Sequence, residues 1–314
     1  MATPCCPISN GLALILCQYA DIRLPRREKP MTSTAASCPA RFETRPLAPF
    51  GIELVGELSA PLSAEEVAFL RAIVEDHAVL VARGQRLTIE RHREIMALFG
   101  PVPERELYIV ELSDGVLGAD PLTFHSDMAF CHTPYRYGSL HALEIEGGRT
   151  STAFANGTRA YKRLTPGQCK LLARLTTLAV STCRTGQAFR EDIPEDAFRT
   201  QRAAVIFHPR TFEPILYVAE AQHARFNELD RAASDALFEA LFPVLYAPDN
   251  VYEHVWSVGD FVLYDNLTLQ HARPDPSSLK VRKLQRMGVA DVSADDMLAE
   301  FLDQSGLPEV TEVA

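Results

Sequence analysis

A histidine and a carboxylate stand two residues apart at His125 and Asp127. On a β-strand, side chains two apart point to the same face, so both groups can share one metal ion. His271 offers a second imidazole, just beyond the strand-like run 261–264 at a sheet rim, where ligands enter. Two imidazoles and one carboxylate leave three positions open on a ferrous ion, which suits chemistry with a co-substrate and dioxygen.

Two arginines follow His271 at a spacing that puts them on one face of a strand. Arg282 and Arg286 lie four residues apart in a strand-like stretch. Guanidiniums can clamp carboxylates bidentately, so the pair can hold dianionic 2-oxoglutarate and an acidic substrate. The alternative is that both are surface arginines of the basic run 280–283.

The elements that must position these residues are short. Helices are predicted where Ser, Thr or Asp cap an amphipathic run, and strands where short apolar runs lie between turn residues. The predicted helices begin at Ser63, Thr88, Thr165 and Asp230. The predicted strands are 77–82, 137–145, 203–207, 214–218, 251–256, 261–264 and 286–290. Many short strands with few helices predict an α+β chain, mainly β, with a double-sheet core, helices on one side and one domain.

Composition excludes several classes of function. The chain has 314 residues, a net charge of −10 and 47% hydrophobic residues, so it can bury a large core. The acidic balance argues against nucleic acid and anionic membranes as partners, because both attract positive charge. Seven cysteines with no C-x-x-C pair indicate reduced thiols, so we expect a cytoplasmic protein.

The first forty residues differ from the rest. The apolar run 11–17 is too short to span a bilayer and has no basic residue before it. We interpret 1–41 as a weakly ordered leader and Met31 as an alternative start. The remaining residues, 42–314, are predicted to form one domain.

Several motifs together make a resemblance specific. They are His125-x-Asp127, the run 147–150, His208-Pro209, the run 264–266, His271, Arg282 and Arg286. In their order and spacing, the chain resembles the taurine dioxygenase (TauD/TfdA-like) family of Fe(II)/2-oxoglutarate-dependent oxygenases, over roughly 42–292.

The resemblance implies a fold and a site. The implied fold is a double-stranded β-helix (jelly-roll) core with flanking helices, and the implied iron ligands are His125, Asp127 and His271. It further implies that Thr150 and Arg282 grip the distal carboxylate of 2-oxoglutarate. The substrate side is assigned to Arg286, facing an anionic group, with Phe124 and Tyr108, under covering loops near 103–121 and 184–202.

The implied activity is that of a dioxygenase using Fe(II), 2-oxoglutarate and O2. It would hydroxylate, or otherwise oxidise, an unactivated C–H bond of a small acidic substrate, releasing succinate and CO2. An amino acid or carboxylate derivative is the expected substrate. The segment 99–103 is not followed by a histidine of the kind that taurine-using members present to a sulfonate, which disfavours taurine itself.

Alternatives stay open at this point. The same centre could cleave a sulfonate or sulfate ester oxidatively. A zinc hydrolase could use the same His/Asp/His set around an activated water, although it would have no use for a 2-oxoglutarate clamp. A catalytically silent jelly-roll that binds a small acid is a third reading, and the sequence leaves a homo-oligomer open.

Overall fold

The computed structural model describes residues 38–102, 108–112, 120–181, 193, 197–274, 276 and 279–290. The predicted leader therefore lies, up to residue 37 and including Met31, outside the described residues. No helix within these ranges combines the length and the apolar character that crossing a bilayer requires.

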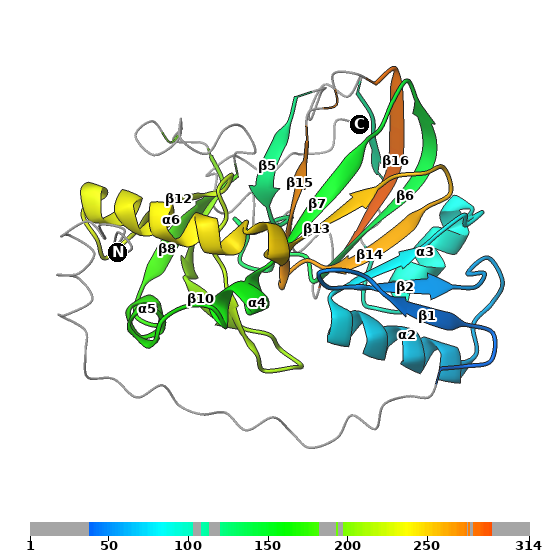
Figure 1. The fold of residues 1–314 in the computed structure, drawn as a ribbon, viewed down its shortest axis with the longest axis horizontal. Helices are drawn as coiled ribbons and strands as arrows, with labels where there is room; N and C mark the ends of the chain where they lie inside the picture. Colours follow the sequence, from blue (N-terminus) through cyan, green and yellow to red (C-terminus); the bar gives the residue numbers. More distant parts are fainter. Residues whose placement is uncertain are drawn as a thin grey trace, which may run out of the picture.

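Two large sheets form the centre of the molecule (Figure 1). The first has seven strands, in the order β1 (Glu43–Pro46), β2 (Ile52–Val55), β3 (Val79–Ala82), β14 (Phe261–Asp265), β6 (Tyr137–Glu146), β16 (Val281–Val289) and β4 (Tyr108–Val110). The second has four, in the order β13 (Val251–Val255), β7 (Ser151–Asn156), β15 (Leu269–Arg273) and β5 (Leu122–His125). Neighbouring strands pair antiparallel, except β2 with β3.

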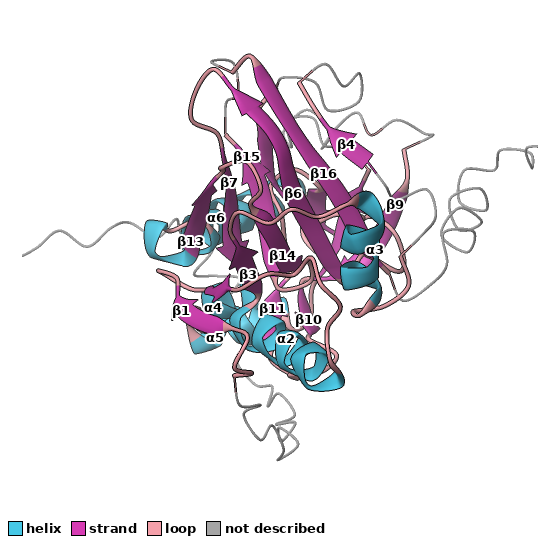
Figure 2. Ribbon diagram, turned by 90° about the vertical axis from the view of Figure 1, so that its right-hand side faces the viewer, coloured by secondary structure: helices cyan, strands magenta, loops and turns pink. Residues whose placement is uncertain are grey.

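Strand β14 shows why the seven-stranded sheet is buried on both faces. Phe261 and Leu263 join a core with the helices α2 (Ala64–His77) and α3 (Ile89–Ala97). Val262 and Tyr264 alternate with them and join a second core with strands of the four-stranded sheet. Since side chains alternate along a strand, one short apolar run serves both cores. Figure 2 shows α2 and α3 beside the strands.

A second group of helices lies apart from these. The helices α4 (Gly157–Tyr161), α5 (Pro166–Leu172) and α6 (Arg231–Leu245) share a core with smaller sheets. Those sheets are formed by β8 (Thr176–Val180), β9 (Arg199–Ala203) and β12 (His223–Phe226), and by β10 (Val205–Phe207) and β11 (Pro214–Leu216); a 3-10 turn, η2 (Pro248–Asn250), precedes β13. The helices therefore form two groups, whereas the sequence pattern placed them on one side.

Most of the predicted starts agree with the structure, and the differences are local. Ser63 and Thr165 form complete capping boxes, and Thr88 and Asp230 cap their helices. The run 77–82 divides between two elements, because α2 continues through His77 and β3 begins at Val79. Helix α4 was not predicted. The resulting architecture is mixed α+β and rich in strands.

Candidate metal centre

Three side chains from two distant parts of the sequence meet at the edge of the four-stranded sheet. His125 ends β5, and His271 lies directly opposite it on β15, with ring centroids 4.2 Å apart. The Asp127 carboxylate lies 3.9 Å from His125 Nε2 through Oδ1 and 3.8 Å from His271 Nε2 through Oδ2. One donor atom from each residue lies within 4.8 Å of the others. This spacing suits metal–ligand bonds of about 2 Å to a shared ion.

The imidazoles present the form that binds metal. His125 Nδ1 donates to the Thr123 carbonyl at 2.8 Å, which leaves the Nε2 lone pair facing Asp127. Burial, followed by the charge of His125, lowers the pKa of His271 to about 3, so this ring is neutral near pH 7. Two imidazoles with one carboxylate fit a ferrous ion that keeps open positions.

The Asp127 carboxylate is held ionised by its neighbours. Burial alone would raise its pKa, but the Arg286 guanidinium, followed by the two imidazoles, outweighs burial and lowers the pKa well below its usual range. Arg286 donates to Oδ2 from Nη2 at 2.9 Å and from Nε at 3.2 Å. The Tyr264 hydroxyl donates to the same oxygen at 3.2 Å, which leaves Oδ1 for a cation.

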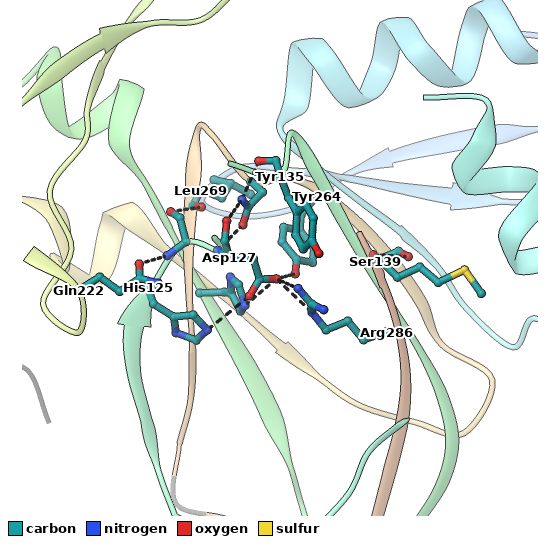
Figure 3. Close-up of polar contacts among 12 residues, drawn as sticks. His125, Asp127, Tyr135, Ser139, Gln222, Tyr264, Leu269 and Arg286 are labelled. Carbon is teal, nitrogen blue, oxygen red and sulfur yellow. Dashed lines mark hydrogen bonds and ion pairs between the residues drawn. The ribbon is translucent and has the colours of Figure 1, made fainter. Parts of the chain in front are cut away.

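The backbone around Asp127 is clasped by buried amides (Figure 3). Asn266 accepts from the Asp127 N–H at 2.8 Å and donates to the Asp127 and Tyr135 carbonyls at 2.9 and 2.8 Å. The preceding residue is fixed from the other side, because Gln222 accepts from the Ser126 N–H at 3.1 Å. Asp127 lies in a turn beyond β5, so the turn and its clasp, not strand pleating, aim the carboxylate at His125.

A buried aspartate and its histidine partner shape the turn that leads into β15. Asp265 accepts from the backbone N–H groups of Leu267 and Thr268 at 2.9 and 3.1 Å. Its other oxygen lies 2.8 Å from His208 Nε2. His208 therefore supports the turn that carries Asn266.

The predicted carboxylate grip is also brought together. Arg282 Nε donates to Thr150 Oγ1 at 3.1 Å, and both side chains are buried. Burial, followed by the charge of Arg273, lowers the pKa of Arg282 to about 9. One cavity joins this region to the metal ligands; its lining is Val110, Leu122, His125, Asp127, Leu140, Thr152, Tyr264, His271, Ala272, Arg273, Arg282 and Arg286.

Some expected positions differ. Phe124 stacks on the Tyr246 ring at 4.2 Å, on the face of β5 opposite His125, and does not line this cavity. The Tyr108 backbone pairs with Arg286 on β16, which places it beside the site. The sequence indicated that His271 lies just beyond the end of the strand 261–264, at a sheet rim. In the structure it lies in the middle of the next strand, β15.

No role was predicted from the sequence for three residues of this site, Tyr264, Asn266 and Arg273. Arg273 stands two residues after His271, the same spacing that singled out Asp127 after His125. That spacing was a usable signal. The clasp by Asn266 was not readable, because it depends on how the turn folds back over residues 126–127.

Comparisons with known proteins agree with this geometry. Residues 43–287 match the family described as "Taurine catabolism dioxygenase TauD, TfdA family". An alkylsulfatase of Acinetobacter baylyi is 26% identical over 76% of this chain and 82% of its own length. An (S)-phenoxypropionate/alpha-ketoglutarate-dioxygenase of Sphingobium herbicidovorans is 26% identical over 73% and 88%.

The fold has solved counterparts. A crystal structure of a taurine dioxygenase from Burkholderia xenovorans superimposes with a TM-score of 0.70 at 25% identity, covering 80% of this chain and 91% of that one. Fe(II) and 2-oxoglutarate are typical of the matched family, and the donor set described above suits both. With its His/Asp/His metal-binding triad, the chain belongs to the TauD/TfdA family of Fe(II)/2-oxoglutarate-dependent dioxygenases.

Proposed function

We propose that this enzyme hydroxylates an unactivated C–H bond of a small acidic substrate, an amino acid or carboxylate derivative, and releases succinate and CO2. The observation that carries the proposal is the meeting, around one cavity, of the His125/Asp127/His271 triad and the Arg282–Thr150 contact. A bound Fe(II) ion would supply oxygen activation coupled to decarboxylation of 2-oxoglutarate.

Each residue has a positional task in this proposal. His125, Asp127 and His271 hold the ion, while Arg282 and Thr150 fix the far carboxylate of the co-substrate, since a guanidinium and a hydroxyl match its oxygens. The cavity's apolar side chains, such as Val110 and Leu140, keep water away from the reacting centre. Arg286 is proposed to meet the substrate's acidic group from beside Asp127, where it now donates.

We also infer the finer architecture from family membership: a double-stranded β-helix core within one domain, residues 42–314. The segments 103–121 and 184–202 are proposed to cover the substrate. Support comes from strand β4, which lies within the first segment and pairs with β16 beside Arg286.

The test is a panel of small carboxylates, amino acids and alkyl sulfates, incubated with Fe(II), 2-oxoglutarate and air. We expect at least one compound to couple oxygen uptake to succinate release, and His125→Ala to lose at least about 100-fold in rate because a ligand is missing. A variant as active as the parent protein would contradict the assignment of the site.

The same panel separates the alternatives. Sulfate release from an alkyl sulfate would favour oxidative ester cleavage, for which the alkylsulfatase relative is the supporting observation. Hydrolysis with Zn(II) in the absence of oxygen would favour a zinc hydrolase. Tight binding of an acid with no succinate formed by the iron-loaded protein would favour a silent binding protein.

A further inference from the structure

A third arginine faces the metal cavity from the strand that carries His271. Arg273 lies two residues after that histidine on β15, so both side chains point to the same face of the four-stranded sheet. It lines the same cavity as Arg282 and is 4% exposed. Its Nη2 donates to the Asp120 carbonyl at 2.5 Å, which fixes the guanidinium in place.

Arg273 and Arg282 approach the cavity from different sheets. Arg282 belongs to β16 of the seven-stranded sheet, and it is buried and oriented by Thr150. Each cation disfavours the other, because the charge of Arg273 contributes to lowering the pKa of Arg282. Two buried positive charges facing one cavity are stabilised when an anion lies between them.

The described lining of the cavity is rich in arginine. It holds three arginines and one carboxylate, Asp127, and that carboxylate already accepts from Arg286. The Thr150 hydroxyl oxygen accepts from Arg282, which leaves its hydrogen free to be donated to an incoming oxygen. This end of the cavity therefore matches a planar carboxylate from two directions.

We propose that Arg273 is a second guanidinium for the distal carboxylate of 2-oxoglutarate, and that with Arg282 it sets the enzyme's preference for a keto diacid over a keto monoacid. This inference rests on the proposed function. Arg273 acts as a co-substrate-binding residue, and its charge contributes only when the ligand carries the second carboxylate.

The experiment compares two ligands of the Mn(II)-loaded protein by isothermal titration calorimetry. N-oxalylglycine replaces a methylene of 2-oxoglutarate with N–H, and N-methyloxamate is the same molecule without the distal carboxylate. We expect Arg273→Gln to weaken N-oxalylglycine about 10- to 100-fold, as losing a charged hydrogen bond does, and to change N-methyloxamate less than about twofold. Arg273→Lys should recover part of the loss, because it keeps the charge without the fork.

Two control variants separate a direct role of Arg273 in ligand binding from an indirect effect on the fold. Arg282→Gln should show the same ligand-selective loss, and Arg45→Gln, on the exposed edge strand β1, should bind both ligands as the parent does. Equal losses for both ligands in Arg273→Gln would indicate a structural role and overturn the inference. Unchanged N-oxalylglycine binding in Arg273→Gln would overturn it as well. A parent protein that shows no Mn(II)-dependent binding of N-oxalylglycine would contradict the proposed function itself.

Discussion

Asn266 shows how a single amide can set a metal ligand without touching the metal. Its side chain binds both the N–H and the carbonyl of Asp127. The turn after β14, which carries Asn266, therefore sets the direction of the carboxylate. Outer partners of this kind tune affinity because they restrict the ligand to the conformation that binds.

Replacing Asn266 with Asp should weaken metal binding about 10- to 100-fold. The new carboxylate can still accept from the Asp127 N–H, but it cannot donate to the two carbonyls. Titration of the metal-free protein with Mn(II) measures the change.

Asn250→Asp is the matched control. Asn250 is also buried and donates to two carbonyls, those of Asn156 and Leu245, away from the triad. It should lower stability while leaving Mn(II) affinity unchanged. Equal affinities for Asn266→Asp and the parent would show that the Asn266 contacts do not control metal binding.

The metal ligands themselves were predictable from the sequence, because residue type and order already limit the chemistry. Phe124 was not, since its adjacency to His125 suggested the site, whereas alternation on β5 turns it toward Tyr246. The partner of Arg286 was also missed. Its contact with Asp127 joins residues 159 positions apart, which no local pattern encodes.

At the scale of elements, the close approach of β6 and β14 explains why residue 138 is a glycine. Gly138 pairs with Tyr264, and a Cβ at this position would overlap the Tyr264 ring and hydroxyl. The absence of a side chain on β6 therefore leaves room for the ring whose hydroxyl donates to Asp127.

Gly138→Ala should cost about 1–3 kcal/mol of unfolding free energy, since the tyrosine must move within a packed core. Urea denaturation measures this cost. In the double variant with Tyr264→Phe, which removes the hydroxyl, the loss should be smaller than the sum of the two single losses. Strictly additive losses would show that the two positions do not interact.

Helix starts were readable from the sequence because capping is local: Ser63 and Thr165 reach residues three positions away. The limits of the strands were harder to predict from the sequence. The β16–β6 ladder shifts register between Lys283 and Leu284, and Arg282 nonetheless keeps its place opposite Ile145. Such a bulge depends on the partner strand, so the predicted strand 286–290 captured only the second half of β16.

For the whole molecule, buried histidines make stability depend on pH, and two of them are not metal ligands. Burial, followed by the charge of His141, lowers the pKa of His92 to about 3, and burial lowers that of His223 to about 4. Both are neutral in the folded protein but take up a proton on unfolding below pH 6.5, the ordinary value.

The unfolded state therefore binds more protons between about pH 6.5 and pH 4, and the free energy of unfolding should fall as pH falls, by about 1.4 kcal/mol per pH unit for each histidine. Urea midpoints at several pH values measure the slope. His92→Gln should reduce this slope by about the contribution of one histidine. An unchanged slope would mean that other groups determine the pH dependence of stability.

The opposition of His125 and His271 has a mechanical consequence. Strand β5 is the last strand of its four-stranded sheet and has only four residues, so its ladder to β15 is short. An ion bound by both rings would hold the edge strand β5 to β15, in addition to the backbone hydrogen bonds of the ladder. The resistance of this edge strand to proteolytic cleavage would then depend on the supply of iron.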